Sequence, residues 1–262
     1  MQGALLVKTV FITGCSSGIG FLAATALKTR GYRVIASCRK QHDQQQLIEQ
    51  GFETILLDLD DPKSVERAAN EVLALTNHRL YALFNNAGFG VYGQLNSITR
   101  EQLEKQFSTN FFAVHQLTQL LLPAMLPYGE GRIIQTSSIV GIIATPGRGA
   151  YCASKYALEA WSDTLRLELA NTGIKVCLIE PGPLATNFSN NTVQTDQAHI
   201  VKNPPIAKRF KLPAEAILPK LYHALESASP KVRYRVTLVT SIAAIGKRIL
   251  PDKLLDKILI NK

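Results

Sequence analysis

Two side chains capable of acid–base chemistry stand four residues apart in the stretch AYCASKYALEAW. On a helix this spacing places Tyr151 and Lys155 on one face, where they can approach each other. A free tyrosine titrates at about pH 10, and an adjacent ammonium stabilises the phenolate and lowers its pKa. The pair therefore predicts a tyrosine that exchanges a proton with a substrate. The alternative for such a pair, taken alone, is an ordinary surface contact.

Two further polar groups strengthen the catalytic interpretation. Ser138 stands at the end of a predicted strand, 13 residues before Tyr151, where its hydroxyl could hold a substrate carbonyl oxygen. Asn110 is a polar amide in a predicted helix whose neighbours are Phe107, Phe111, Phe112 and Val114. Together with the Tyr–Lys pair, these residues form a candidate catalytic set of four.

A glycine-rich turn follows the first predicted strand and opens the first predicted helix. Glycines in such a turn let the backbone approach a pyrophosphate, whose charge the free amides at a helix N-terminus stabilise. An ordinary strand-to-helix turn is the alternative, and the position within the first 20 residues favours a nucleotide site. The candidate cofactor-binding residues of this turn are Gly14, Ser16, Ser17, Gly18, Ile19 and Gly20.

The end of the second predicted strand indicates which dinucleotide would bind. An NAD site places a carboxylate here for the ribose 2′-hydroxyl, but this chain has Arg39 and Lys40. A guanidinium can form a forked contact with a 2′-phosphate, so NADP(H) is favoured over NAD(H), unless the two cations are merely solvated. Less diagnostic candidates end the third and fourth strands on the same sheet edge: Asp58, Leu59, Asn86, Ala87 and Gly88.

Apolar strand-like runs alternate with amphipathic helical stretches along the chain, which is typical of a parallel sheet. The predicted fold is one α/β domain over 1–262, a doubly wound (Rossmann) parallel seven-stranded sheet with helices on both faces. The predicted strands are Thr9–Thr13, Tyr32–Cys38, Thr54–Asp58, Leu80–Asn85, Arg132–Ser137, Lys175–Glu180 and Tyr234–Val239. The predicted helices are 18–30, 43–50, 62–76, 99–126, 150–171 and 214–228, with caps expected at Asp61-Pro62 and at Thr99 with Gln102.

The segment 183–212 has no clear period and follows a strand end, where ligands of open α/β sheets bind, so we expect a substrate lid there. Apolar residues are expected to border the site, which favours a small lipophilic aldehyde or ketone as substrate, although apolar loops can be merely packed. These residues are Phe89, Tyr92, Ile139–Ile143, Pro146 and Phe188.

Composition excludes several classes. Hydrophobic residues make up 46% of the 262 residues, and no apolar run reaches the roughly 18 residues that span a bilayer. The short apolar stretch before the first motif contains Lys8 and is not typical of a secretory signal. The four cysteines (Cys15, Cys38, Cys152, Cys177) have neither disulfide nor metal-ligand spacing, so no metal is expected. We expect a soluble cytoplasmic protein.

The net charge of +9 is unevenly distributed. Residues 1–200 carry 16 cations and 16 carboxylates, whereas residues 201–262 carry 13 and 4. A nucleic-acid binder would be more evenly basic, so no nucleic-acid partner is expected. Apolar residues recur at helical spacing in a basic extension, 241–262, interrupted by Pro251. This extension could pack on the domain or on a partner subunit, contact an anionic membrane peripherally, or receive an acidic carrier protein.

From Thr9 to about Val239 the chain resembles the short-chain dehydrogenase/reductase family. The resemblance rests on the TGxxxGxG turn, the NNAG stretch at 85–88, the Asn–Ser–Tyr–Lys set and the pair Pro181-Gly182. Within the family, GCSSGIG, NNAGFGVYG and TPGRGAYCASKYALEAWSD resemble bacterial NADP-dependent aldehyde reductases, and more distantly retinol and 17β-hydroxysteroid dehydrogenases. The departures lie in 190–212 and in the tail.

The resemblance implies hydride transfer between nicotinamide C4 and a carbonyl carbon, with Tyr151 as acid or base. Lys155 would lower the pKa of Tyr151 and hold the nicotinamide ribose, Ser138 would polarise the carbonyl, and Asn110 would bind a water that links Lys155 to solvent. Pro181, Gly182 and Thr186 would lie at the nicotinamide, and a homo-oligomer is expected. The alternatives are an NADPH-dependent reductase of carrier-bound 3-oxoacyl groups and a non-catalytic NADP(H)-sensing protein.

Overall fold

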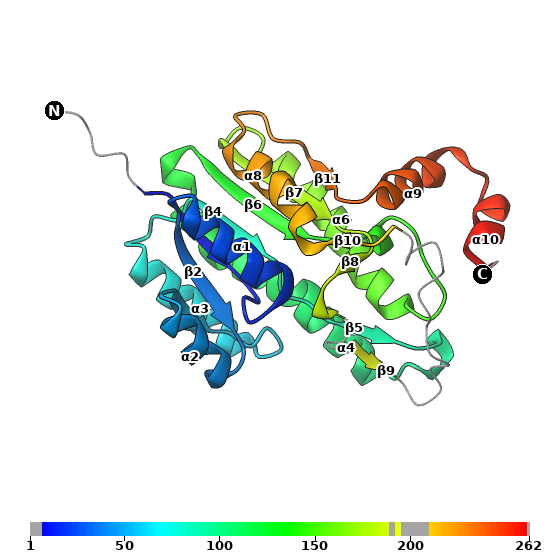
Figure 1. Ribbon diagram of the computed structural model, residues 1–262, viewed down its shortest axis with the longest axis horizontal. Coiled ribbons are helices and arrows are strands. Elements are labelled where there is room, and N and C mark those ends of the chain that lie inside the picture. The colour runs from blue at the N-terminus through cyan, green and yellow to red at the C-terminus, as the bar shows by residue number, and fades with distance from the viewer. Residues whose placement is uncertain (1–6, 189–191, 195–209, 261–262) are drawn as a thin grey trace.

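A seven-stranded parallel sheet forms the centre of the molecule, with strand order β11-β7-β6-β4-β1-β2-β3 (Figure 1). The computed structural model describes residues 7–188, 192–194 and 210–260. All seven strands were predicted, and the seven-stranded doubly wound fold is confirmed. Their bounds are β1 Thr9–Ile12, β2 Arg33–Cys38, β3 Glu53–Leu56, β4 Ala82–Asn85, β6 Gly131–Thr136, β7 Ile174–Glu180 and β11 Arg233–Arg235.

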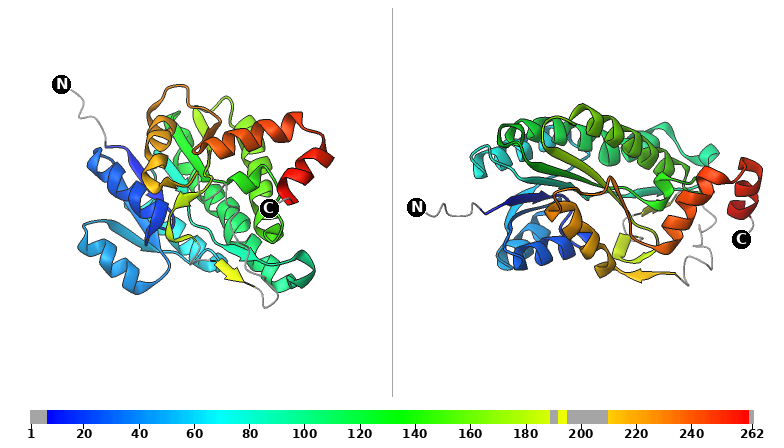
Figure 2. Two further views of the ribbon diagram at one scale, coloured as in Figure 1. Left: turned by 45° about the vertical axis from the view of Figure 1, so that its right-hand side comes forward. Right: turned by 90° about the horizontal axis from the view of Figure 1, so that it is seen from above.

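Helices cover both faces of the sheet, as the view from above shows (Figure 2). On one face, α1 (Gly18–Thr29), α2 (Gln41–Glu49) and α8 (Leu218–Glu226) pack on alternate strand residues that include Val10, Val34 and Phe84. On the other, α3 (Pro62–Leu75), α5 (Ala113–Leu121) and the end of α6 (Gly149–Glu168) pack on the intervening residues, among them Phe11, Ile35 and Leu83. Because both faces are buried, the strands are apolar throughout.

The two predicted helix caps form as expected. The Asp61 carboxylate accepts a hydrogen bond from the Lys63 amide at 2.9 Å, with Pro62 at the first helical position of α3. Thr99 and Gln102 form the reciprocal capping box that starts α4 (Arg100–Phe107). Each cap satisfies amides that the first helical turn leaves without partners.

The predicted helix 99–126 is not continuous. A π-helical turn over Ser108–Phe112 separates α4 from α5, and two 3₁₀ turns, Leu122–Ala124 and Leu126–Tyr128, replace the last part. Proline at 123 and 127 explains the ending, because each lacks an amide donor for a helical hydrogen bond. The π turn has no such signal in the sequence.

The last predicted strand, Tyr234–Val239, is too long. β11 ends at Arg235, and Leu238 and Val239 begin α9 (Leu238–Ile249). The cause is a cap: Thr237 accepts a hydrogen bond from the Thr240 amide and starts the helix. After Pro251, α10 (Asp252–Ile260) follows, so the C-terminal extension is helical as predicted but begins at 238 and not at 241.

The predicted lid 183–212 contains regular structure where it is described. At its two ends, β8 (Leu184–Ala185) pairs with β10 (Leu212–Pro213). In between, β9 (Thr192–Gln194) pairs in parallel with β5 (Gly90–Tyr92), which follows the NNAG stretch. The two ends of the segment are therefore held together, and its middle is held to β5, in two small sheets that are separate from the seven-stranded one. Residues 189–191 and 195–209 lie outside the described residues.

Candidate active site

The glycine turn at the end of β1 is fastened to the end of β4. A Cβ on Gly14, whose φ is +74°, would lie 2.8 Å from the Ala87 Cβ. The Thr13 hydroxyl accepts hydrogen bonds from the Asn86 and Ala87 amides, both at 3.0 Å, and the Asn86 side-chain amide donates to the Thr13 carbonyl at 3.0 Å. The NNAG stretch thus holds the turn in shape, and a glycine at 14 is required by both close approach and φ.

The N-terminus of α1 is open to an anion. Ser17 occupies the N-cap position without a side-chain capping bond, and the first turn contains no acidic residue. Gly18 has φ +60°, and a Cβ there would meet only Thr186, at 3.9 Å, among the described residues. This cradle of small residues and free amides, which one side chain would fill, fits the pyrophosphate of a dinucleotide.

The predicted adenosine side of the site lies at the ends of β2 and β3. Arg39 and Lys40 are exposed, and within residues 7–188, 192–194 and 210–260 neither is in an ion pair. The Asp58 carboxylate accepts from the Asp60 amide at 3.0 Å, and Leu59 is buried beside it. The guanidinium of Arg39 and the ammonium of Lys40 are therefore available to bind a phosphate in addition to the pyrophosphate.

The predicted nicotinamide side lies at the end of β7. The Pro181 carbonyl accepts from the Ile139 amide at 2.8 Å, directly after Ser138. A Cβ on Gly182 would lie 2.1 Å from the Thr237 hydroxyl, so this glycine permits α9 to start against the strand end. Thr186 lies over Gly18 and joins this side of the site to the glycine turn.

The π turn carries Asn110 into the site. Its side-chain oxygen accepts from the Phe89 amide at 3.1 Å, and its nitrogen donates to the Phe89 carbonyl at 3.0 Å and to Ser154 at 3.2 Å. A Cβ on Gly88 would lie 3.1 Å from the Asn110 oxygen and 3.8 Å from the Lys155 Nζ, so both side chains close around this glycine. Asn110 therefore connects the β4 end with α6.

The other three candidate catalytic residues meet at the start of α6. The Ser138 hydroxyl is hydrogen-bonded to the Tyr151 hydroxyl. Lys155 Nζ donates to the Thr136 carbonyl at 2.7 Å and lies 5.8 Å from the centre of the Tyr151 ring. The structure thus brings all four predicted side chains together beside the glycine turn, and the Thr136 carbonyl is a partner that sequence reasoning missed.

Burial controls the protonation of this group. It raises the pKa of Tyr151 well above the usual value, with the neighbouring Tyr92 adding to the shift and the Ser138 hydrogen bond opposing it. Burial also lowers the pKa of Lys155 to about 8, and the Glu159 carboxylate partly opposes this. Burial governs the pKa of Tyr151, and the expected lowering of this pKa by Lys155 stays a prediction.

Aromatic rings enclose Tyr151, which is 7% exposed. Tyr92 lies 6.1 Å from its ring centre, and Phe188, from the predicted lid, lies 5.6 Å away on a tilted plane. Val140 and Ile139 complete this apolar cluster. The predicted border residues Tyr92, Ile139 and Phe188 therefore line the tyrosine, whereas Pro146 is exposed.

A buried ionic cluster behind Lys155 was not predicted. Arg233 donates to Glu159 at 3.0 Å and to Asp163 at 2.6 Å, and its Nε lies 3.2 Å from the fully buried Glu180. Burial and the nearby Glu159 raise the pKa of Glu180 to about 7. The only sequence signal was the spacing of Lys155, Glu159 and Asp163, four residues apart on α6, since Glu180 and Arg233 come from β7 and β11.

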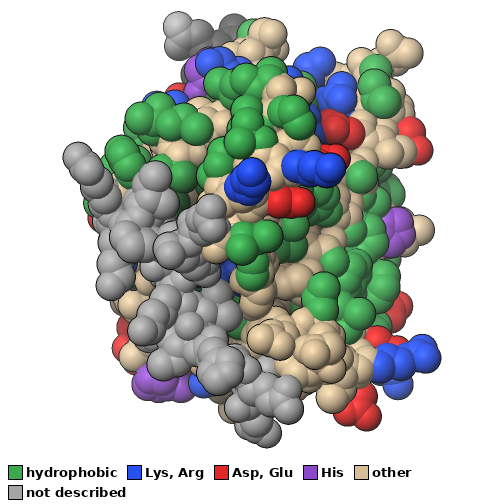
Figure 3. Space-filling model, turned by 90° about the vertical axis from the view of Figure 1, so that its right-hand side faces the viewer, with side chains coloured by type: hydrophobic (Ala, Val, Ile, Leu, Met, Phe, Trp, Pro, Cys, Tyr) green, Lys and Arg blue, Asp and Glu red, His purple; other side chains and the backbone are tan. Residues whose placement is uncertain are grey.

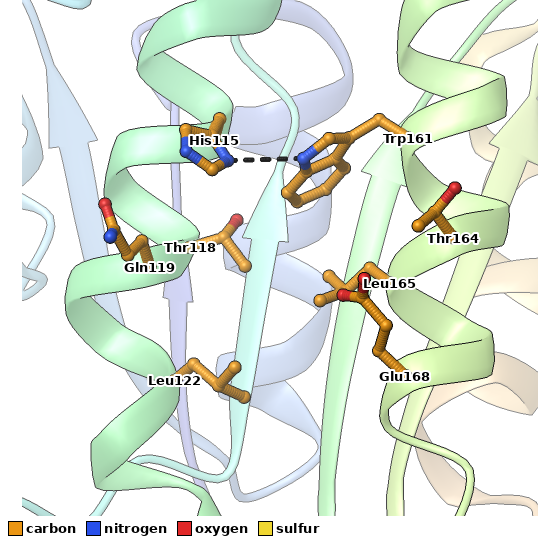
Figure 4. Close-up of a pocket in the computed structure, with 8 residues that line it drawn as sticks. All are labelled: His115, Thr118, Gln119, Leu122, Trp161, Thr164, Leu165 and Glu168. Atoms are coloured by element: carbon orange, nitrogen blue, oxygen red, sulfur yellow. Dashed lines mark hydrogen bonds between the residues drawn. The ribbon is translucent and has the colours of Figure 1, made fainter.

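A separate cavity of about 330 Å³ lies between α5 and α6 (Figure 4). Trp161 donates to His115 Nδ1 at 3.2 Å across it, and none of the predicted site residues lines it. In the part of the chain that the structure describes, no cluster of three metal-ligating side chains occurs.

Comparison with known proteins identifies the class. The family model described as short chain dehydrogenase matches residues 8–197. The chain belongs to the short-chain dehydrogenase/reductase family, and it is an oxidoreductase of this type. The resemblance drawn from the motifs is confirmed.

Particular relatives share almost the whole chain. The uncharacterized oxidoreductase YbbO of Escherichia coli (strain K12) is 58% identical over 259 residues, which cover 99% of this chain and 96% of that protein. The NADPH-dependent 3-dehydrocapnine reductase of Ornithobacterium rhinotracheale is 34% identical, covering 96% of each chain. Human retinol dehydrogenase 5 is 35% identical, covering 95% of this chain and 87% of that protein.

The fold has a close counterpart among solved structures. A short-chain dehydrogenase from Streptomyces avermitilis superposes with a TM-score of 0.84 at 26% identity and covers 98% of each chain. The arrangement of the sheet and its helices is therefore that of the family.

Proposed function

We propose that this chain is an NADP(H)-dependent oxidoreductase that transfers hydride between the nicotinamide and a lipophilic aldehyde or ketone, or the corresponding alcohol. The observation that carries the proposal is the meeting of Tyr151, Ser138 and Lys155 beside an open glycine turn. A protein that kept only the fold would not need all three side chains at this place.

Arg39 and Lys40 support NADP(H) over NAD(H), because they supply positive charge where a carboxylate would select the free ribose hydroxyl. Gly14, Gly18 and the amides of α1 would hold the pyrophosphate, and Lys155 the nicotinamide ribose. When bound, the nicotinamide supplies or accepts the hydride. The printed name of the relative from Ornithobacterium, an NADPH-dependent reductase, agrees with this preference.

The side chains of the site would supply the proton and the orientation. Ser138 would hold the carbonyl oxygen of the substrate, and Tyr151 would donate its proton to the oxygen as it becomes an alkoxide. The raised pKa keeps Tyr151 protonated at neutral pH, so the phenol carries the proton that reduction of a carbonyl consumes. Asn110 would position a water through which Lys155 exchanges protons with solvent.

The walls around Tyr151 favour an apolar substrate. Tyr92, Phe188 and Ile139 pack around the Tyr151 ring and offer few fixed polar groups that would select a sugar or a hydroxy acid. Phe188 precedes β9, and a substrate that reaches Tyr151 would displace this ring. An apolar surrounding of this kind favours a medium-chain or aromatic aldehyde.

The test is a panel of medium-chain aldehydes, aromatic aldehydes and hydrophilic aldehydes, with turnover followed by the loss of NADPH absorbance. We expect turnover with NADPH and a preference for the apolar members. Binding of NADPH without turnover of any member would favour a sensing protein. Activity only on carrier-bound 3-oxoacyl groups would favour the carrier-protein alternative.

A further inference from the structure

The helix that follows the sheet exposes large apolar side chains along one side. Leu238, Ile242, Ile245 and Ile249 are 62%, 59%, 54% and 71% exposed. Their spacing of three and four residues places them on one face of α9. The opposite side contains Thr240 and Ala244, which are buried against the domain. The apolar face of this helix is thus turned outward, the reverse of a helix that stabilises a core.

The second helix of the extension continues the apolar surface. Leu254, Ile258 and Ile260 of α10 are exposed, while Leu255 is buried and fixes this helix in place. We call these seven exposed residues of α9 and α10 the C-terminal apolar face. Several large apolar side chains exposed on two neighbouring helices are typical of an interaction surface.

Cations accompany this face. Residues 238–260 contain Lys247, Arg248, Lys253 and Lys257, which are exposed, against two carboxylates, Asp252 and Asp256, a net charge of +2. The chain from 201 on carries 13 cations and 4 carboxylates. Figure 3 shows the side of the molecule that carries α9 and α10, where hydrophobic side chains stand next to those of Lys and Arg.

We propose that the C-terminal apolar face binds the surface of an anionic lipid bilayer, with α9 and α10 lying in the interface. A bilayer surface offers apolar volume and negative charge together, which is what the isoleucines and their flanking lysines require. In the described residues no helix is long and apolar enough to cross a bilayer, so the contact is peripheral. A second copy of the chain is a poorer occupant, because a two-fold interface would bring the same cations together.

The position of the face connects it with the candidate active site. Thr237, which caps α9, lies against Gly182 at the end of β7, and α9 also lies against the 3₁₀ turn Ile139–Gly141 that follows Ser138. Figure 1 shows α9 and α10 on the side of the sheet where the predicted lid strands β8 and β10 lie. If the proposed function holds, a lipophilic substrate could pass from the lipid to the site over a short path. The lipid contact itself does not depend on that function.

The experiment is co-sedimentation of the full chain with vesicles of phosphatidylglycerol and phosphatidylcholine, and with vesicles of phosphatidylcholine alone. We expect binding to the anionic vesicles that weakens with salt. Ile245→Asp with Ile249→Asp should reduce it by about tenfold or more, and Lys253→Gln with Lys257→Gln should remove most of the preference for anionic lipid. The matched control is Leu167→Asp on α6, which is 65% exposed and lies outside the C-terminal apolar face, and it should bind as the unchanged chain does.

Two results would overturn the proposal. One is that the unchanged chain does not bind anionic vesicles, or that the double isoleucine variant binds them as well as the unchanged chain does. The other is that the unchanged chain sediments as a dimer and the variant as a monomer, while both still bind lipid. This result would assign the C-terminal apolar face to contact with a second copy of the chain. Circular dichroism and NADPH binding of each variant show that the fold is retained, so failure of the aldehyde assay alone leaves the lipid result unaffected.

Discussion

The start of α6 and the C-terminal helices depart from the usual distribution of residues in opposite ways. Along α6, Tyr151 and Lys155 are buried, with Lys155 hydrogen-bonded to the Thr136 carbonyl, and behind them buried carboxylates pair with Arg233. Along α9, large aliphatic side chains are exposed to solvent. Buried polar groups and exposed apolar groups are both informative, because each costs stability that only a function explains. The buried groups at α6 suit a reaction site, which must exclude water. The exposed side chains of α9 suit a binding surface, which must stay accessible to a partner.

The largest effect is expected at the buried tyrosine. Tyr151→Phe keeps the ring packed between Tyr92 and Phe188 but removes the proton donor. We expect kcat for aldehyde reduction to fall by about a thousandfold or more, with NADPH affinity nearly unchanged. Steady-state kinetics and fluorescence titration with NADPH measure the two quantities. Substantial residual kcat would contradict the role of Tyr151.

A second effect concerns the choice of dinucleotide. Arg39→Asp replaces an unpaired cation by the carboxylate that a 2′-hydroxyl prefers. We expect KM for NADPH to rise roughly 10- to 100-fold, because a charge-assisted hydrogen bond is lost and repulsion is added, while KM for NADH changes little. An equal change of both constants would exclude contact with the 2′-phosphate. Lys63→Asp, an exposed cation at the start of α3, serves as control.

The pH profile tests the ionic cluster behind the site. The pKa of Lys155 is lowered to about 8 by burial, so its charged form is lost, and activity should fall, as the pH rises through that value. Glu159→Gln removes the carboxylate that raises this pKa, and the falling limb of kcat/KM should move to lower pH. Asp163→Asn, which contacts the same Arg233 at the more exposed end, should leave the limb in place. Identical pH profiles for Glu159→Gln and the unchanged chain would show that the ionic cluster does not affect the pKa on which activity depends.

Stability should respond to the same cluster in a defined direction. The pKa of Glu180 is raised to about 7, so between about pH 4.3 and 7 the folded state binds more protons than the unfolded state. The free energy of unfolding therefore decreases as the pH rises through this window. Glu180→Gln should remove this part of the pH dependence, on the order of 1 to 3 kcal/mol, in urea unfolding at pH 5 and pH 8. A slope unchanged by the substitution would show that Glu180 stays ionised.

The smallest effect is expected on the exposed helix. Ile249→Ala removes an apolar side chain that is 71% exposed, so the free energy of unfolding should change by no more than about 0.5 kcal/mol. Leu221→Ala on α8, where the side chain is fully buried, should cost about 2 to 5 kcal/mol in the same urea titration. A large loss at Ile249 would mean that the C-terminal apolar face stabilises the chain instead of serving contact.

Sequence reasoning recovered the features that depend on local chemistry. The seven strands, the cap at Asp61 and the capping box at Thr99 follow from residue type and spacing, and so does the glycine turn. The shared location of Tyr151, Ser138 and Asn110 was expected from the family resemblance, and only the place of Ser138 follows from the carboxyl end of a parallel strand.

Features that depend on tertiary contact could not be predicted. The π turn forms where Asn110 bonds to the Phe89 backbone, and the raised pKa of Tyr151 follows from burial among rings contributed by β5 and by the segment after β8. The Glu180–Arg233 contact joins neighbouring strands that are far apart in sequence. The length of β11 was overestimated because Thr237 acts as a helix cap in a run with strand-like composition.

The π turn at Ser108–Phe112 fixes the number of residues between the two halves of this helical stretch. Each residue of an α-helix rotates the chain by about 100°. If the stretch were a regular helix with the same number of residues, everything after the extra residue would be rotated by that angle. The wide turn absorbs the extra residue, so Leu117 and Leu121 of α5 stay against the sheet while Asn110 is carried to the Phe89 backbone. Deleting one residue here should therefore leave α5 packed on the sheet but remove the Asn110 contacts.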